Sequence, residues 1–295
     1  MMARLLLIGS NGQLGQYLKE IFVSDDSDYE LISLTRDELD LSELNKIDEL
    51  IRLINPEIII NASAYTAVDR AEEQQELAFT INALAPEIMA QTCFDLSIPL
   101  IHFSTDYVFS GDAKTPYRET DEPDPQGVYG LSKLQGEQAI LTSQCEAYIF
   151  RTAWVYSQRG NNFYKSMLRL ASERSKLGIV NDQFGSPTYA SSIAIAIAEI
   201  SQKILDKTVS TRTGVYHMTC GGMTNWSSFA KAIFDAENVD IVVNEIATSD
   251  YPTPAKRPAY SVLDNKKLLS NFGVQLPSWQ DALDACVAEI TQQNR

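Results

Sequence analysis

Residues 5–15 read Leu5-Leu6-Leu7-Ile8-Gly9-Ser10-Asn11-Gly12-Gln13-Leu14-Gly15. The first four are apolar without polar alternation, which is typical of a parallel strand covered on both faces. Three glycines follow where such a strand ends, and a helical pattern runs from them to about Phe22. Strand, glycine turn and helix in this order are the setting in which proteins bind a dinucleotide. An ordinary strand-to-helix turn is the alternative, and the setting favours the dinucleotide.

The glycines suit a bound pyrophosphate for steric reasons. Residues without a Cβ permit a tight turn, let the backbone approach the phosphates and let the helix pack on the strand. The free amides of the first helical turn and the helix dipole then attract the phosphate charge. We therefore predict that the cofactor contacts Gly9, Gly12, Gln13, Leu14 and Gly15.

Four more short apolar runs, separated by helical patterns, follow at 30–34, 57–61, 99–104 and 147–151. Crossover helices between such strands predict an α/β protein with a Rossmann-type, doubly wound parallel sheet. After Arg151 the pattern loosens into loops. We expect a dinucleotide-binding Rossmann domain over residues 1–160, with later returns to the sheet near 190–219. Residues 161–295 are expected to form mainly a smaller, C-terminal substrate-binding lobe.

The composition excludes several classes of function. A formal net charge of -15 over 295 residues repels a phosphate backbone, so nucleic acid is not an expected partner. The four cysteines lie far apart, which argues against a zinc site and against a secreted disulfide framework. The apolar run at 5–8 is too short for a signal core or a membrane span. We expect a cytoplasmic protein that does not bind membranes.

The end of the second predicted strand bears on the choice of cofactor. Thr35 and Arg36 stand where a carboxylate would accept hydrogen bonds from the ribose of NAD. A guanidinium suits a ribose 2′-phosphate, so we expect NADPH. A solvated surface arginine is the alternative, and the neighbouring Asp37 could serve a ribose, which leaves NADH open.

Tyr129 and Lys133 are four residues apart, which places them one turn apart on the same face of a helix. Ketone reduction needs a proton donor matched to neutral pH, and free tyrosine, with a pKa of about 10, is too weak an acid. A lysine cation about 4 Å away favours the phenolate by roughly 4 kcal/mol, or about three pKa units. The pair predicts a reductase, although with 13 tyrosines this spacing arises easily by chance.

A second signal supports the pair. Residues 98–107 read as a buried strand with a polar end, which places Thr105 at the carboxyl edge of the sheet, where ligands of open α/β folds bind. There Thr105 would hydrogen-bond a substrate carbonyl and Tyr129 would protonate it. Lys133 would tune Tyr129 and hold the nicotinamide ribose. Alternatively, Thr105 merely caps the following turn.

Several segments together resemble one enzyme family. They are Gly9–Gly15, Asn61–Asp69, Ser104–Phe109, Tyr129–Lys133 and Arg151–Tyr156, with 182–188 and 257–258 in support. Over nearly its whole length the chain resembles the dTDP-4-dehydrorhamnose reductases, which are extended short-chain dehydrogenases/reductases. The resemblance implies NAD(P)H-dependent reduction of the C4 ketone of dTDP-4-dehydro-L-rhamnose, which gives dTDP-L-rhamnose for cell-surface polysaccharide.

The resemblance also assigns roles to residues. Asp40 and Leu41 would cover the adenine, although Asp40 also suits a helix cap. Four residues after the third strand would line the cofactor: Ala62, Ala64, Tyr65 and Thr66. The sugar nucleotide would contact Thr105, Asp106 and Trp154, and an indole buried in the core is the other interpretation of Trp154.

The diphosphate of such a substrate needs a local cation in so acidic a protein. Arg257 is the candidate, because prolines at 254 and 258 restrict the backbone around it and could present its guanidinium to the cleft. A solvated loop arginine is the alternative.

Some members of the resembling family bind magnesium at a dimer contact through acidic side chains, one of them shortly after the glycine loop. The aligned residue here is Tyr17, which makes magnesium doubtful, and no metal site is expected. A homodimer that does not depend on the metal stays open.

Two other functions fit parts of the pattern. Other nucleotide-sugar reductases and epimerases share the glycine loop and the Tyr129/Lys133 pair, whereas the match around Thr105 and Trp154 favours the reductase. The resemblance extends to an NADP-binding regulatory subunit of methionine adenosyltransferase that has no catalysis of its own. The intact Thr105, Tyr129 and Lys133 favour an enzyme.

Overall fold

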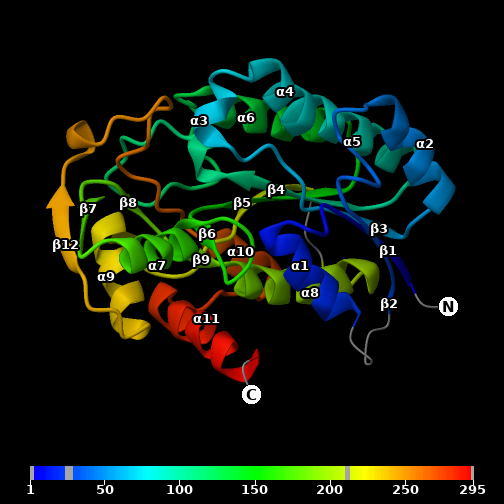
Figure 1. Ribbon diagram of the computed structural model, residues 1–295. Helices are drawn as coiled ribbons and strands as arrows, with labels where there is room; N and C mark the ends of the chain where they lie inside the picture. Colours follow the sequence, from blue (N-terminus) through cyan, green and yellow to red (C-terminus); the bar gives the residue numbers. More distant parts are fainter. Residues whose placement is uncertain (1–2, 24–28, 210–212, 294–295) are drawn as a thin grey trace.

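The computed structural model describes residues 3–23, 29–209 and 213–293, with side chains up to residue 289. A parallel sheet forms the middle layer, helices cover both of its faces, and a second group of helices and short strands stands at one end (Figure 1). This arrangement confirms the predicted α/β, Rossmann-type fold. All four cysteines are free and buried. Across the described ranges, no helix is both long and apolar enough to cross a membrane.

The main sheet, as far as the chain is described, has six parallel strands. Their order across the sheet is β10 (Gly214–His217), β5 (Ala147–Thr152), β4 (Leu100–Thr105), β3 (Ile58–Asn61), β1 (Ala3–Ile8) and β2 (Tyr29–Leu34). The five strands predicted from the apolar runs are present, each within two residues of the predicted bounds. The sixth, β10, adds to the edge beside β5.

The strand order reverses at β1, because the chain passes from β1 to β2 on one side and then crosses to β3 on the other. In an open α/β sheet this reversal leaves a ligand crevice beyond the carboxyl ends of the strands. Ile8 and Asn61 are register partners at these two ends. The glycine loop and the loop after β3 therefore start side by side.

Helices cover both faces of the sheet. One face carries α1 (Gln13–Phe22) and α8 (Ala190–Leu205), and the other carries α2 (Asn45–Ile54), α5 (Ala85–Leu96) and α6 (Val128–Thr142) (Figure 1). Successive residues of β1 alternate between the two cores: Leu5 and Leu7 pack with α1 and α8, Leu6 and Ile8 with α2 and α5. Both faces of β1 are buried against helices, which explains why its sequence shows no alternation of apolar and polar residues.

The second group of elements comes mainly from the later part of the chain. It contains α7 (Phe163–Glu173), β7 (Lys176–Val180), α9 (Trp226–Ala236), β12 (Val242–Ile246) and α11 (Trp279–Gln293). Short parallel or antiparallel pairs connect it: β6 (Val155–Tyr156) with β9 (Thr188–Tyr189), and β8 (Phe184–Gly185) with β11 (Thr224–Asn225). The remaining short elements are α3 (Val68–Ala71), α4 (Gln75–Phe79), α10 (Lys266–Phe272), a π-helical turn Thr80–Leu84 and 3-10 turns Asp106–Val108 and Thr248–Asp250.

Two glycines set how closely α6 lies against its neighbours. A Cβ at Gly136 would overlap the carbonyl oxygen of Asn82, and a Cβ at Gly130 would overlap that of Tyr107. In both cases the obstacle is backbone, which cannot rotate away as a flexible side chain would. The absence of these two methyl groups therefore allows the close approach that places Tyr129 beside the carboxyl end of β4.

We expect Gly136→Ala to destabilise the fold by about 1–3 kcal/mol, because the added methyl group has no room against the Asn82 carbonyl. Thermal unfolding measures the loss as a lower melting temperature. Gly178→Ala is the control, since its Cβ would meet only the Ile246 methyl groups at 3.5 Å, an ordinary contact. Equal melting temperatures for the two variants would contradict the close packing of α6.

Candidate functional site

The glycine loop turns sharply after β1. Gly9 has a φ of +86°, in the left-handed region, and a Cβ there would lie 2.9 Å from the backbone of Ser63. A Cβ at Gly15 would overlap the carbonyl oxygen of Gly9. Gly12 precedes α1 with an extended backbone. The first amides of α1 have no partner inside the helix and are the groups that an anion can bind.

The side chain of Gln13, a predicted cofactor residue, is engaged elsewhere. Its Oε1 accepts hydrogen bonds from Ser157 Oγ at 3.1 Å and from Asn162 Nδ2 at 2.8 Å. Leu14 is half-buried and packs against the core. At Gln13 and Leu14, therefore, the backbone and not the side chain is left to contact a cofactor.

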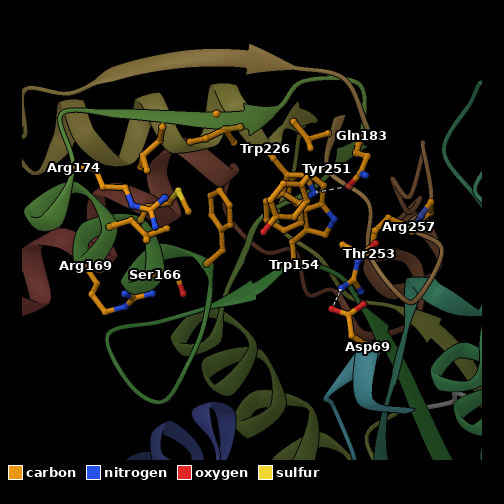
Figure 2. A pocket seen from close by; sticks show the side chains of 18 of the residues that line it. Asp69, Trp154, Ser166, Arg169, Arg174, Gln183, Trp226, Tyr251, Thr253 and Arg257 are labelled. Atoms are coloured by element: carbon orange, nitrogen blue, oxygen red, sulfur yellow. Dashed lines mark hydrogen bonds and ion pairs between the residues drawn. The ribbon is translucent and has the colours of Figure 1, made fainter. Parts of the chain in front are cut away.

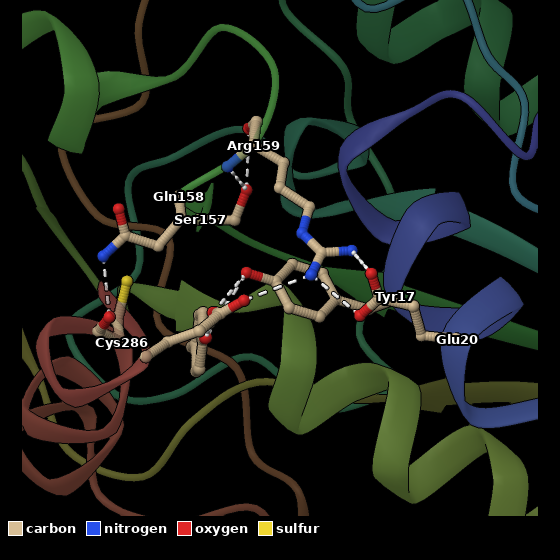
Figure 3. A network of polar contacts seen from close by, with 8 residues as sticks. Tyr17, Glu20, Ser157, Gln158, Arg159 and Cys286 are labelled. Carbon is tan, nitrogen blue, oxygen red and sulfur yellow. Dashed lines mark hydrogen bonds and ion pairs between the residues drawn. The ribbon is translucent and has the colours of Figure 1, made fainter. Parts of the chain in front are cut away.

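Arg159 stands between two carboxylates at the outer side of α1. Its guanidinium nitrogens lie 2.7 Å from Glu20 and 3.1 Å from Glu289 (Figure 3). The guanidinium also covers the ring of Tyr17 at 4.0 Å, and the Tyr17 hydroxyl donates to Glu289 at 2.7 Å. The described part of the chain contains no group of three or more His, Cys, Asp or Glu side chains that could hold a metal.

Arg36 lies just beyond β2, and 73% of its side chain is exposed. Its Nε lies 3.2 Å from the Asp40 carboxylate. Asp40 accepts hydrogen bonds from the Ser42 amide and hydroxyl at 2.9 and 2.8 Å, and these bonds hold the pKa of Asp40 below its usual value. Asp40 thus caps the turn before α2, while Leu41 is buried in the core. The Arg36 guanidinium is accessible to a ligand.

The loop after β3 is held by a residue that the sequence analysis missed. The buried Asn82 side chain accepts from the Tyr65 amide at 2.8 Å and donates to the Tyr65 carbonyl at 3.0 Å. It also donates to Ser132 Oγ of α6 at 3.0 Å. In the sequence, Asn82 stands out as a side-chain amide within the mainly apolar stretch 78–85, and this could have marked it as a structural residue. The other residues predicted to line the cofactor lie in the same loop, half-buried or exposed: Ala62, Ala64 and Thr66.

Thr105 and Tyr129 meet at the carboxyl end of β4. Burial raises the pKa of Tyr129, and the nearby Thr105 hydroxyl opposes the rise. The Thr105 hydroxyl also accepts from the Tyr107 amide at 3.2 Å, so it caps the following turn as well. It donates to Asp106 Oδ1 at 3.0 Å. Burial raises the pKa of the Asp106 carboxyl to about 6.

Lys133 is buried one turn further along α6, and its amine is directed to β4. Nζ donates to the Phe103 carbonyl at 2.6 Å and lies 3.2 Å from Nε2 of His102. Burial lowers the pKa of Lys133 to about 8. Within the described ranges no hydrogen bond joins Lys133 to Tyr129. The tuning of Tyr129 by Lys133, which the spacing predicts, is therefore not seen; the pKa of Tyr129 is raised by its burial.

A cavity of about 680 Å³ opens next to Tyr107, whose ring contacts Tyr129, between the two lobes (Figure 2). Trp154 and Trp226 form its central wall, with ring centres 3.4 Å apart and planes 6° apart. Trp154 has a φ of +49°, which is uncommon for a bulky residue. Its indole occupies the space where a Cβ of Gly185 would lie. Trp154 therefore lines the cavity and is not an indole of the core.

Arg257 lies at one end of the cavity. Its Nη2 is 2.6 Å from the Asp69 carboxylate, and its Nη1 donates to the Tyr107 hydroxyl at 3.2 Å. The Tyr107 ring meets the Tyr129 ring edge to face, with centres 5.5 Å apart. With 21% of its side chain exposed, Arg257 is not a solvated loop arginine. Through Tyr107, Arg257 connects the cavity to Tyr129, and the charge of Arg257 is matched by Asp69.

The other end of the cavity carries three further cations: Arg169, Arg174 and Lys176. In Figure 2, Arg169 and Arg174 lie on one side of the stacked indoles, and Asp69 and Arg257 on the other. Arg169 pairs with Glu173 at 3.1 Å. Among the described residues, Arg174 and Lys176 form no ion pair, and both are exposed. The sequence analysis missed these cations because they come from a helix and a strand that it did not place.

Comparison with known proteins adds to this geometry. A family model described as "RmlD substrate binding domain" matches residues 2–292. The chain belongs to this RmlD family. It is 43% identical to a dTDP-4-dehydrorhamnose reductase of Aggregatibacter actinomycetemcomitans over 96% of this chain and 97% of that protein. A reductase of the same name from Sinorhizobium fredii is 40% identical over 95% of both chains.

A solved structure resembles this RmlD-family chain along its length. It is the dTDP-4-dehydrorhamnose reductase of Bacillus anthracis in complex with NADP, with a TM-score of 0.90 and 35% identity. The match covers 98% of this chain and all of that one. The shared fold therefore extends over nearly the whole of both chains.

In this RmlD-family chain we expect Gly185→Ala to displace the Trp154 indole, because the new methyl group would overlap the ring. Near-ultraviolet circular dichroism should lose the exciton signal of the stacked Trp154–Trp226 pair. The third tryptophan gives the control: Trp279→Phe removes a ring that contacts Phe229 and neither stacked indole, so it should leave that signal in place. An unchanged signal in Gly185→Ala would show that the glycine does not seat the indole.

Proposed function

We propose that the protein reduces the C4 ketone of dTDP-4-dehydro-L-rhamnose with NADPH and forms dTDP-L-rhamnose. One observation carries the proposal: a half-buried proton donor, Tyr129, stands beside Thr105 at the carboxyl edge of the sheet, next to a cavity of the size that small-molecule sites have. The relatives named for this reaction support it. The four buried free thiols suit the reducing cytoplasm, where we place the enzyme.

The glycine loop fits a dinucleotide. Its positive-φ glycine and the free amides at the start of α1 suit a pyrophosphate, and the buried hydroxyl of Ser10 has no hydrogen-bond partner in the described structure. We propose that Arg36 binds the ribose 2′-phosphate, since its guanidinium is accessible at the end of β2. A reduced nicotinamide bound beyond these residues supplies the hydride.

The protein's part in the reaction is to hold the ketone and deliver a proton. Thr105 and Tyr129 place two hydroxyls together, so that a carbonyl oxygen can accept from Tyr129 and, once Thr105 turns its one proton away from Asp106, from Thr105 as well. Burial raises the pKa of Tyr129, so the residue is protonated at neutral pH but is a weaker acid than free tyrosine until a neighbouring cation favours its phenolate. We propose that Lys133, whose pKa is lowered to about 8, holds the nicotinamide ribose and supports Tyr129 once the ligands are bound.

We propose that the sugar nucleotide lies along the cavity. The sugar would lie near Tyr107, Asp106 and Arg257, the end in contact with Tyr129, and Trp154 would pack against it. Arg257 is already compensated by Asp69, so the diphosphate is better served by the uncompensated cations Arg174 and Lys176. This arrangement reconciles a dianionic substrate with a chain of net charge -15, because the attraction is local.

Tyr129→Phe should lower kcat by about a hundredfold to ten-thousandfold, the usual contribution of a general acid, and leave NADPH affinity nearly unchanged. The assay follows absorbance at 340 nm with the keto sugar made in situ by the preceding enzymes, and the product is identified. Wild-type protein that binds NADPH but oxidises none of it would favour the regulatory-subunit alternative. A different product would favour another nucleotide-sugar reductase or epimerase.

Arg36→Ala should weaken NADPH binding by roughly 1 to 3 kcal/mol, the scale of a charge-assisted hydrogen bond, and barely change NADH binding. Fluorescence titration of each cofactor measures both constants. Equal losses for NADPH and NADH would remove Arg36 from recognition of the 2′-phosphate.

Arg174→Ala and Lys176→Ala should each raise the KM for the keto sugar about tenfold, equivalent to about 1.4 kcal/mol, and leave NADPH affinity alone. Lys165→Ala is the matched control, since Lys165 is exposed on α7 but does not line the cavity. If Arg257→Ala raises KM while the two variants behave like the control, the diphosphate lies at the Arg257 end instead.

A further inference from the structure

A line of buried polar side chains runs from β3 through β4 to α6, behind the catalytic cluster. Asn61 Nδ2 lies 3.1 Å from His102 Nδ1, and His102 Nε2 lies 3.2 Å from Lys133 Nζ. Asn61 and His102 are register partners in adjacent parallel strands, so the sheet itself sets their contact. At most 1% of each of the three residues is exposed, so water does not substitute for any of these contacts.

The orientation of the Asn61 amide is determined by a second contact. Its Oδ1 accepts a hydrogen bond from the Ser63 amide at 3.1 Å. A backbone N–H is only a donor, so the atom facing Ser63 must be the oxygen and the atom facing His102 must be the NH₂ group. Asn61 therefore donates to Nδ1 of His102.

This donation fixes the tautomer of His102. A neutral imidazole carries one proton, and if Nδ1 accepts a hydrogen bond the proton must be on Nε2. The doubly protonated ring has no lone pair for Asn61, and burial holds the pKa of His102 well below its usual value. His102 therefore points an N–H group at Lys133.

The proton on Nε2 of His102 also determines which form of Lys133 can accept from it. A protonated lysine has three donors and no lone pair, so it cannot accept from His102 Nε2–H. The neutral amine can accept from His102 while it donates to the Phe103 carbonyl at 2.6 Å. One arrangement of protons thus satisfies every contact. Asn61 donates to His102, His102 donates to the neutral amine of Lys133, and Lys133 donates to the Phe103 carbonyl.

Few charges act on this line. Glu137 of α6 favours the charged form of Lys133, but Arg151 of β5 holds that carboxylate with two hydrogen bonds of 2.9 and 2.6 Å. The neighbouring elements carry other ionisable groups: Asp106 and Tyr107 after β4, Asp69 and Arg70 in α3, Glu76 in α4, and Glu87, Cys93 and Asp95 in α5. Of all these groups, Glu137 is the one that contributes to the shift in the pKa of Lys133.

We propose that Asn61 locks His102 in the Nε2-protonated tautomer, and that His102, by donating to Lys133, sets the pH range in which Lys133 carries its charge. His102 is then a positioning residue that acts through Lys133 and does not touch the substrate. Its consequence for activity rests on the proposed function, whereas the tautomer and the lysine equilibrium exist in the protein alone. Where the cation of Lys133 supports Tyr129, activity falls as pH rises through the lysine equilibrium.

The lock is tested directly by nitrogen-15 NMR of the histidines. The chain has only two, His102 and His217, and His217→Gln identifies the signals of His102. We expect His102 to remain neutral with its proton on Nε2 in the wild-type protein from pH 6 to pH 9. A proton on Nδ1, or a doubly protonated ring, would overturn the proposal without any variant or any activity.

The second experiment changes the lock. In Asn61→Asp a carboxylate oxygen accepts from Nδ1–H, so Nε2 becomes an acceptor for the Lys133 ammonium. In Asn61→Ala the ring is free to adopt the same tautomer. NMR of labelled lysine, with Lys133 assigned by Lys133→Met, should place the lysine equilibrium near pH 8 in the wild type and at least one pH unit higher in both variants.

The pH profile of kcat/KM for NADPH, which reports groups of the free enzyme, should shift in parallel. Asn181→Ala, in the second lobe, is the control and should leave the alkaline limb in place. An unchanged lysine equilibrium in both Asn61 variants would overturn the proposal. The contacts among Asn61, His102 and Lys133 would then be structural only, and their loss would lower stability without changing the pH at which Lys133 titrates. If the wild type oxidises no NADPH, the proposed function fails, and the NMR measurements still decide the lock.

Discussion

The candidate site depends on a buried ion pair. Arg151 of β5 and Glu137 of α6 meet through two hydrogen bonds, with side chains 4% and 2% exposed. An unpaired charge at this depth is unfavourable by several kcal/mol, so β5 and α6 are stable only in the position where the two groups meet. That position brings α6 across the end of β4, and with it Tyr129 to Thr105. Trp154 lies two residues after the end of β5 and lines the cavity.

Much of this architecture is legible in the sequence, for a physical reason. Strands buried on both faces need uninterrupted apolar residues, so the run at 5–8 predicts β1 directly. A glycine loop requires positions where a Cβ collides with neighbouring backbone, and Gly9 and Gly15 meet that description. Thr105 could be placed because a strand end is visible as the step from apolar to polar residues. Each of these features depends on a few consecutive residues, so a short stretch of sequence is enough to predict it.

What the sequence does not disclose depends on contacts between distant segments. Helical spacing puts Tyr129 and Lys133 on one face, but the direction of the lysine amine follows from the register of β3 and β4, which sets His102 beside Asn61. Arg257 is found as a cation near prolines, whereas its partner Asp69 lies 188 residues earlier. The stack of Trp154 on Trp226 requires the folded second lobe. Such pairs become visible only when the topology is known.

The network around Arg159 has a bearing on how the protein is made. Tyr17 and Glu289 are 272 residues apart, and Arg159 joins both to Glu20 at the outer side of the first helix. Contacts of such long sequence separation close late in folding, because their loop entropy must be offset by structure formed before them. During vectorial synthesis, the contacts of Glu289 with Tyr17 and Arg159 form only after α11 has left the ribosome. A nascent chain without α11 therefore lacks the carboxylate that Tyr17 and Arg159 share in the folded protein.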